Sequence, residues 1–284
     1  MGKTAFVLAG GGSFGALQVG MLHALLEHGL APDLIVGASV GAINGAYLAG
    51  SPTPAGIENL SRLWLQVRRS DIFGVGILSA ARFFLRRDFL MTADGLRALI
   101  ERHLPYARLE QASVPVHIIA TDFLTGEAVV LSQGPAADAI LASSAIPVAF
   151  APVEIDGRYL VDGAVTSNTP VSIAARLGAT RIIVLPTGFA CALEQPPHGA
   201  IANALHALTL LIARQLVAEL ESLDDSIEFA VVPTPCPRKG SPYDFTNAAA
   251  MIQTGLVICR QWIEDGGLEN RSIPGSLRAH GHHP

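Results

Sequence analysis

A serine flanked by glycines is the residue of this chain that points most directly to chemistry. Ser39 lies between Gly37 and Gly41 in the pentapeptide GASVG, which fits the pattern G-x-S-x-G. This pattern places a nucleophilic serine on a sharp turn between a strand and a helix, where strained backbone angles and close neighbours require very small flanking residues. The same position aims the serine at a helix N-terminus, whose N–H groups favour developing negative charge. We predict that Ser39 is a nucleophile; the alternative is a serine that only shapes a turn.

A glycine-rich segment precedes this serine. Residues 10–15 have the sequence GGGSFG and follow a short apolar run. The segment also fits G-x-G-x-x-G, the phosphate-binding loop of dinucleotide-binding folds, but those folds expect an acidic residue at the end of the second strand. Here Asp33 begins the second apolar run, and the GASVG pentapeptide takes its end. The other use of such a loop is an oxyanion hole, in which backbone N–H groups face a tetrahedral intermediate.

The serine needs a base, and one aspartate stands out. Asp162 precedes Gly163 in the sequence RYLVDG, where the glycine allows another group to approach the carboxylate closely. A carboxylate that accepts the hydroxyl proton directly would form a two-residue dyad, whereas a structural aspartate in a turn is the alternative. No histidine has a triad-like context. His117 falls within an expected strand, His198 follows two prolines, and His206 falls in the middle of an expected helix.

The elements that must position these residues alternate along the first fifty residues. Apolar runs at 4–9 and 33–37 predict buried strands, and the patterns at 15–28 and 40–48 predict helices. The order strand–helix–strand–helix implies a parallel sheet, whose loops after each strand emerge at one edge. The glycine-rich loop and Ser39 are therefore expected to be neighbours.

The rest of the chain continues in the same manner. Strands are predicted at 114–122, 128–131, 181–185 and 227–233, and helices at 138–144, 170–177, 200–222 and 244–264. Residues 147–153 are expected to form a loop that leads into the segment 157–163. We predict one domain over residues 1–265 and a flexible tail over residues 266–284.

Composition narrows the class of protein. Of 284 residues, 50% are hydrophobic and only 15% are charged, which indicates a folded core and excludes a disordered chain. A net charge of −5 with 19 lysines and arginines argues against a nucleic-acid binder. Three cysteines at unrelated spacings indicate neither a disulfide framework nor a metal site, and they favour a reducing compartment. With no signal-peptide pattern, a cytoplasmic location is expected.

Positive charge is concentrated in one segment. Residues 51–113 carry nine arginines and six acidic residues, and residues 55–110 are expected to form a helical insert. One interpretation is a set of solvated helix faces around ordinary core side chains. The other is a mobile lid over about residues 57–104 that contacts anionic lipid headgroups. The lid interpretation rests on the apolar residues Phe73, Ile77, Leu78, Phe83, Phe84 and Leu85 and the basic residues Arg68, Arg69, Arg82, Arg86 and Arg87.

Four blocks in order along the chain resemble the patatin-like phospholipases, over about residues 4–190. They are GGGSFG at 10–15, GASVG at 37–41, SAIP at 144–147 and DGA at 162–164. Each block alone is a weak signal, but the set in this order and spacing is highly specific. The resemblance implies a serine–aspartate dyad without histidine, an oxyanion hole built from the glycine-rich loop, and acyl-ester hydrolysis without a metal.

Carried over by position, the resemblance makes Ser39 the nucleophile and Asp162 the base. The residues implied for the oxyanion hole are Gly10, Gly11, Gly12 and Phe14. The glycines that support the motifs are Gly15, Gly37, Gly41 and Gly163. Plant-type members have arginine or lysine in place of Phe14. A backbone donor survives this change, but a positive charge beside the oxyanion does not.

Together these observations predict a three-layer α/β/α fold with a central, mainly parallel sheet. The predicted function is a serine acyl-ester hydrolase that acts on lipid esters without cofactor or metal. Two alternatives come from other classes: a catalytically silent lipid-binding scaffold on the same fold, and a dinucleotide-binding oxidoreductase. The expected partners are a lipid or other ester and, peripherally, an anionic membrane, but not nucleic acid. The oligomeric state is left open.

Overall fold

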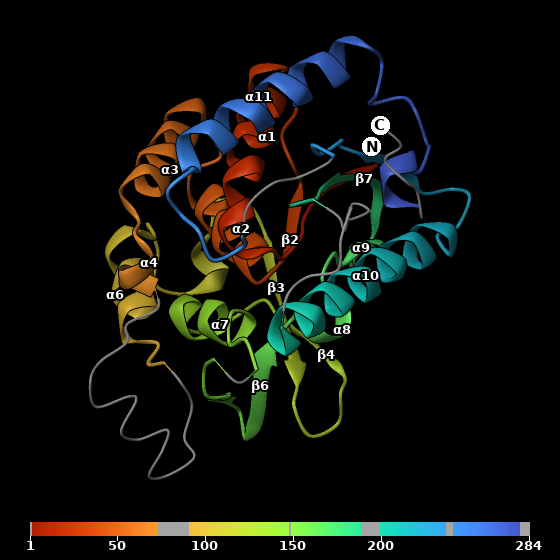
Figure 1. Cartoon of the computed structure of the whole chain (residues 1–284). Coiled ribbons are helices and arrows are strands. Elements are labelled where there is room, and N and C mark those ends of the chain that lie inside the picture. The colour runs from red at the N-terminus through yellow and green to blue at the C-terminus, as the bar shows by residue number, and fades with distance from the viewer. Residues whose placement is uncertain (1, 73–90, 148, 189–198, 237–240, 279–284) are drawn as a thin grey trace.

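A single mixed sheet runs through the molecule (Figure 1). The computed structural model describes residues 2–72, 91–147, 149–188, 199–236 and 241–278. The strand order is β5-β6-β3-β2-β1-β7-β8, with β4 paired to β3 off this path. The strands are β1 Lys3–Leu8, β2 Leu34–Ala38, β3 Val116–Asp122, β4 Ala128–Leu131, β5 Val153–Ile155, β6 Arg158–Asp162, β7 Ala179–Leu185 and β8 Glu228–Val231. The predicted three-layer α/β/α fold with a mainly parallel sheet is confirmed.

Helices cover both faces of this sheet. The α-helices are α1 Gly15–Glu27, α2 Val40–Gly50, α3 Pro54–Gln66, α4 Arg69–Ile72, α6 Asp94–His103, α7 Ala136–Ser143, α8 Ala164–Ser167, α9 Val171–Arg176, α10 Ala200–Glu221 and α11 Ala248–Glu264. Short 3-10 helices are η1 Gly12–Phe14, η2 Leu109–Gln111 and η3 Gly275–Leu277. Helices α1, α2, α3 and α11 gather on one side of the sheet, and α9 and α10 on the other (Figure 1).

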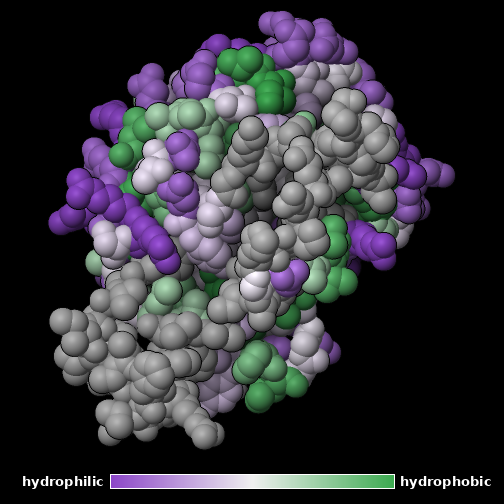
Figure 2. Space-filling view, in the orientation of Figure 1, coloured by the Kyte–Doolittle hydropathy of each residue, from purple (hydrophilic) through white to green (hydrophobic). Residues whose placement is uncertain are grey.

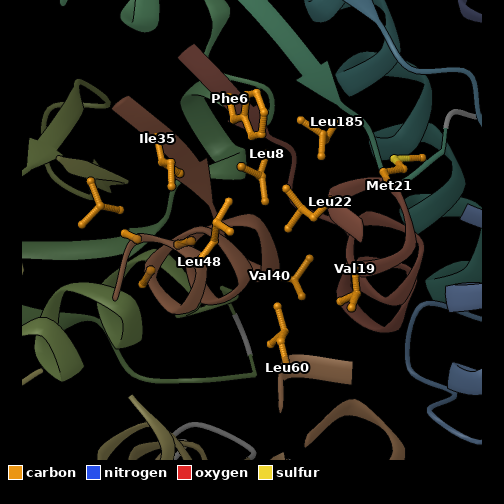
Figure 3. Close-up of a cluster of buried hydrophobic side chains, with 14 of the residues drawn as sticks. Phe6, Leu8, Val19, Met21, Leu22, Ile35, Val40, Leu48, Leu60 and Leu185 are labelled. Carbon is orange, nitrogen blue, oxygen red and sulfur yellow. The ribbon is translucent and has the colours of Figure 1, made fainter. Parts of the chain in front are cut away.

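The central strand β1 shows why the sheet needs both layers. Its residues are buried from Ala5 onward, and the alternation of strand side chains sends them to opposite faces. Phe6 and Leu8 join the core under α1 and α2, as Figure 3 shows, whereas Ala5 and Val7 join the core under α9 and α10. Strand β1 pairs in parallel with β2 and β7. Because parallel sheets occur almost only where both faces are covered, helices are needed on both sides of β1.

One edge of the sheet differs from the sequence-based prediction. The stretch 147–163, for which no strand was predicted, contains the antiparallel hairpin β5–β6, and β6 pairs antiparallel with β3. A tight turn joins the two strands through Asp156 and Gly157, both with positive φ. This dipeptide between alternating residues is a strong hairpin signal that the prediction missed.

The described part of the arginine-rich segment contains the helices α3, α4 and α6. Its flanking helices α3 and α6 bury Ile57, Leu60 and Ile100 in the main core, so they are part of the packed domain. The lid hypothesis depends on Phe73, Ile77, Leu78, Phe83, Phe84 and Leu85 and on Arg82, Arg86 and Arg87, which lie outside the described residues. It therefore stays a prediction.

The segment after residue 265 is predicted to be a flexible tail, and this stays a prediction. In its described part Leu277 is buried, and the Arg271 guanidinium donates to the Asp225 carbonyl at 2.9 Å. Cys259 is buried and free, whereas Cys236 is disulfide-bonded, which the spacing of cysteines in the sequence did not indicate. No helix in the described part of the chain is long and apolar enough to cross a membrane.

Candidate active site

Ser39 lies on the turn between β2 and α2, as the sequence predicted. Its backbone angles are φ 53° and ψ −124°, a combination that costs energy for any residue with a side chain. The neighbouring glycines make the turn sterically feasible. A methyl group on Gly37 would collide with the carbonyl oxygen of Gly41, and one on Gly41 would collide with that of Leu8. The strained turn therefore depends on close backbone packing between the end of β1 and the start of α2.

Asp162 faces this serine from the end of β6. The Ser39 hydroxyl donates to Asp162 Oδ2 at 2.8 Å, and the Ala164 N–H donates to Asp162 Oδ1 at 2.8 Å. The side chains are well buried, with Ser39 8% and Asp162 4% exposed. Gly163 is needed next to the carboxylate because a methyl group there would collide with the carbonyl oxygen of Ile119. Two residues 123 positions apart thus form a direct hydroxyl–carboxylate pair.

Burial sets the electrostatics of this pair. Burial raises the pKa of the Asp162 carboxyl to about 6, although hydrogen bonds from Ala164 and Ser39 act in the opposite direction. A carboxylate with a raised pKa is a stronger base than an ordinary aspartate, yet it is still ionised at neutral pH. Of the histidines considered from sequence, His117 lies on β3, where burial lowers its pKa, and the side chains of His198 and His206 lie outside the described residues.

The end of α7 connects the serine to the aspartate. Ser143 Oγ accepts the Ser39 N–H at 2.9 Å and donates to the carbonyl of Ile119 on β3. The Ala145 carbonyl accepts the Asp162 N–H at 3.0 Å. This bridge gives the SAIP block and its preceding serine a physical role. The sequence pattern marked the SAIP block but not Ser143, whose side chain holds the backbone of Ser39.

The glycine-rich loop lies against Ser39, also as expected. A methyl group on Gly10 would lie 3.1 Å from Ser39 Cβ, and the Gly10 N–H donates to the Asn168 carbonyl at 3.0 Å. The Phe14 N–H donates to the Gly11 carbonyl at 3.3 Å. The N–H groups of Gly11 and Gly12 make no hydrogen bond to any described residue. Of the four residues implied for the oxyanion hole, these two have donors available for a ligand.

A buried polar network supports the loop from below. The Gln18 amide donates to the carbonyls of Ala9 and Leu185, at the ends of β1 and β7. The Asn44 amide donates to Gln18 Oε1, and the Trp64 indole N–H donates to Asn44 Oδ1, both at 2.9 Å. Gln18 and Asn44 are fully buried. Because every partner here is satisfied, the network fixes α1, α2 and α3 relative to the strand ends.

An apolar pocket opens from Ser39. It is lined by Gly12 and Ser39, by apolar side chains of α2, α3 and α6, by the segment after α7, and by Phe245. The cavity itself is narrow, with a volume of about 80 Å³, below the usual range for drug-sized ligands. A narrow apolar pocket next to Ser39 suits an extended apolar chain better than a bulky ligand.

The chain beyond residue 190 contributes to this site, although its sequence suggested no role. Phe245 stacks on Trp64 with ring centroids 6.0 Å apart. The Pro242 carbonyl accepts the Ser13 N–H at 2.7 Å, and it would collide with a methyl group on Gly12, whose φ is +60°. The segment before α11 therefore holds the glycine-rich loop in place. No sequence motif indicates a contact between residues as far apart in the chain as Ser13 and Pro242.

Comparisons with known proteins agree with the four sequence blocks. The family model described as patatin-like phospholipase matches residues 6–175, more than half of the chain. An uncharacterized NTE family protein of Mycobacterium bovis is 33% identical over 187 residues, covering 64% of this chain and 48% of that protein. The patatin-like phospholipase domain-containing protein 7 of Rattus norvegicus is 28% identical over 186 residues, covering 65% and 13% respectively. The chain thus spans about half or less of these relatives.

Two solved structures were also matched. VipD from Legionella pneumophila has a TM-score of 0.48 and 16% identity, covering 93% of this chain and 67% of that one. Human GIVD cytosolic phospholipase A2, in complex with methyl gamma-linolenyl fluorophosphonate, has a TM-score of 0.46 and 13% identity, covering 95% and 60%. The family model, which spans most of the sheet and both Ser39 and Asp162, is the deciding comparison. On that basis, the chain belongs to the patatin-like phospholipase family.

Proposed function

We propose that the protein is a serine acyl-ester hydrolase that acts on lipid esters through Ser39 and Asp162. The observation that carries the proposal is the 2.8 Å hydrogen bond from the Ser39 hydroxyl to a buried carboxylate, at the end of an apolar pocket. Family membership supports a lipid hydrolase in general terms. The dyad, the oxyanion loop and the ester specificity are our inference from the geometry.

In the first half-reaction, Ser39 Oγ attacks the ester carbonyl carbon while Asp162 accepts the hydroxyl proton. The carbonyl π electrons move to the oxygen, and the N–H groups of Gly11 and Gly12 stabilise the resulting oxyanion. The bond to the alcohol oxygen then breaks, and the leaving alkoxide takes the proton from Asp162. The products of this half are the free alcohol and an acyl ester of Ser39.

In the second half-reaction, water takes the place of the serine hydroxyl. Asp162 accepts a proton from water while the water oxygen attacks the acyl carbon. The same N–H groups stabilise the second oxyanion. Collapse breaks the bond to Ser39 Oγ, which takes the proton back from Asp162. The carboxylic acid leaves, and the dyad returns to its starting state.

A serine-directed fluorophosphonate probe tests this function. We expect the wild-type chain to be labelled at Ser39 and to hydrolyse short p-nitrophenyl esters. Ser39→Ala should abolish both, whereas Ser226→Ala, which changes an exposed serine, should affect neither. A folded wild-type chain that is neither labelled nor active would contradict the proposal and leave the silent lipid-binding scaffold.

The rival mechanisms have their own tests. A triad would require that replacing His117, His198 or His206 by glutamine abolishes turnover, and we expect each variant to remain active. The dinucleotide-binding alternative requires an acidic residue near the glycine-rich loop. Asp33 instead accepts the Thr4 N–H at 2.7 Å before β2 begins. Thermal stabilisation of the chain by NAD or NADP would favour that alternative, and we expect none.

A further inference from the structure

The two ends of the glycine-rich loop are anchored by buried side chains of α1 and α2. Gln18 Nε2 donates to the carbonyl of Ala9, the residue before the loop, at 2.8 Å. Asn44 Nδ2 donates to the carbonyl of Gly15, the last residue of the loop, at 2.9 Å. The same nitrogen of Asn44 donates to Gln18 Oε1, also at 2.9 Å. One direct contact between two amides therefore joins both ends of the loop that carries the proposed oxyanion donors.

Asn44 also reaches the wall of the apolar pocket. Its Oδ1 accepts the Trp64 indole N–H at 2.9 Å. The Trp64 side chain lines the pocket beside Ser39 and stacks on Phe245. A methyl group on Gly15 would lie 3.1 Å from Trp64 Cζ2, so the end of the loop packs closely against the same ring. The loop and the pocket wall are thus connected through one side chain.

The chemistry of the partners allows this network only one arrangement. Both hydrogens of Gln18 Nε2 go to backbone carbonyls, those of Ala9 and Leu185, which can only accept. Gln18 Oε1 is therefore left to accept from Asn44 Nδ2. Asn44 Oδ1 in turn faces the Trp64 indole N–H, which can only donate. Turning either amide over would set acceptor against acceptor, so each member of the network fixes the next.

Burial makes this arrangement rigid. Gln18 and Asn44 are 0% exposed, and Trp64 is 6% exposed. Hydrophilic side chains of this helical layer otherwise gather on the outer surface, as Figure 2 shows at the upper end of α11. An unmade hydrogen bond costs more in a buried site than at the surface, because no water replaces the lost partner. A displacement of the indole is therefore passed on to Asn44 and to the loop.

We propose that Asn44 is a positioning residue that links the acyl-chain pocket to the glycine-rich loop, so that the length of the acyl chain controls turnover as well as binding. The proposal rests on the proposed function, since it concerns the loop that faces the oxyanion. A chain packed against Trp64 fixes the indole, the indole fixes Asn44, and Asn44 fixes both ends of the loop. Part of the binding energy of the chain thereby aligns the Gly11 and Gly12 donors, which raises kcat rather than only lowering KM.

A change at the pocket end of the link gives the first test. Trp64→Phe removes the indole N–H but keeps an aromatic ring beside Phe245. In the wild type we expect kcat for p-nitrophenyl octanoate to exceed kcat for the acetate about tenfold. In Trp64→Phe this ratio should fall to about one, with KM for the octanoate changed less than about threefold. Trp262→Phe is the matched control, because it changes the other tryptophan, on α11 and outside the pocket, and it should keep the wild-type ratio.

A change at the loop end gives the second test. Asn44→Asp keeps an acceptor for the Trp64 indole but loses the donors to Gly15 and Gln18. We expect kcat to fall about tenfold or more for both esters, and the ratio between them to fall to about one. A loss confined to KM in Trp64→Phe would overturn the proposal and leave Trp64 as a lining residue. A wild-type ratio near one, or an unchanged ratio in either folded variant, would overturn it as well.

Hydrogen exchange separates failure of this proposal from failure of the proposed function. 1-Octanol offers the pocket an apolar chain without an ester to hydrolyse, so the measurement needs no activity. We expect 1-octanol to slow amide exchange in residues 10–15 of the wild type but not of Trp64→Phe. Equal slowing in both chains, or none in the wild type, would overturn the proposal. A wild-type chain that is protected by octanol but lacks esterase activity would instead refute the proposed function, and this wild-type measurement remains valid if a variant does not fold.

Discussion

The two residues of the proposed dyad, Ser39 and Asp162, are held in place by different means. Ser39 lies at the centre of a parallel sheet, on a turn whose shape is imposed by backbone packing between β1, β2 and α2. Asp162 lies near the antiparallel edge, on a hairpin strand, and is held by hydrogen bonds from Ala164 and Ser39. Ser39 is therefore placed by steric constraint and Asp162 by polar contacts. We expect the two regions to respond differently to the same kind of change.

The largest expected effect is on turnover when either side chain is replaced. Ser39→Ala should lower kcat/KM about 10⁴-fold or more, because nothing else can form the acyl-enzyme. Asp162→Asn should lower it by about 10²- to 10⁴-fold, because the amide cannot accept the proton but water can in part replace the base. Ester hydrolysis with circular-dichroism melts measures both. Full activity in either folded variant would remove that residue from the mechanism.

The pH dependence isolates the aspartate. Since its pKa is raised to about 6, kcat/KM should be constant above pH 7 and fall about tenfold per unit below pH 6. The unfolding free energy should change with pH in the opposite direction to the activity. The pKa of Asp162 in the folded state lies above the usual 3.8, so ionisation of this carboxyl disfavours the fold. The stability contribution of Asp162 is thus present below pH 3.8 and lost as pH rises through about 6.

Melting curves of wild type and Asp162→Asn between pH 4 and pH 8 test that sign. We expect the stability of the wild type relative to the variant to decline as pH rises, whereas Ser226→Ala should follow the wild type throughout. A pH-independent difference would show that burial does not set the pKa of this carboxyl.

The steric side of the comparison is tested by glycine substitutions. Gly41→Ala should cost about 3 kcal/mol of unfolding free energy, because the added methyl group meets the Leu8 carbonyl in the central strand. Gly163→Ala should cost about 1 kcal/mol, because the β5–β6 hairpin at the edge can shift to relieve the contact with Ile119. Gly275→Ala, with open space around it, is the control. Denaturant unfolding measures all three, and equal costs at Gly41 and Gly163 would contradict the comparison.

The smallest effect is expected at Phe245, a pocket residue that belongs neither to the turn at Ser39 nor to the β5–β6 hairpin. Phe245→Ala should lower kcat/KM about tenfold for long-chain p-nitrophenyl esters but change it little for the acetate, because only the long chain reaches this apolar contact. Val257→Ala, an exposed change on α11, should affect neither substrate. Equal losses for both chain lengths would show that Phe245 does not contact the acyl chain.

The sequence predicted the parallel half of the fold, and it singled out Ser39 and Asp162, which the structure brings into hydrogen-bond contact, for identifiable reasons. Strands such as β2 and β7 are short apolar runs, and the turn at Ser39 needs glycines that mark it. The β5–β6 hairpin was missed because its strands are very short and one face is exposed.

Most of the supporting residues were not predicted. Ser143, Asn168 and Pro242 reach the site through single hydrogen bonds between distant segments, and Gln18 and Asn44 lie in helices that otherwise look apolar. Polar side chains in such helices are the one signal that would have pointed to a buried network.

The pairing of β1 with β7 has a consequence for how the protein is made. Residues 3–8 need residues 179–185 as a partner strand, and the loop after β1 needs the carbonyl of Pro242. Synthesis proceeds from the N-terminus at roughly 5–20 residues per second, so the first strand waits on the order of ten seconds for its neighbour. During that interval the apolar residues of β1 lack their neighbour on one side. The glycine-rich loop and the strand before it therefore reach their final packing only after residue 242 has been made.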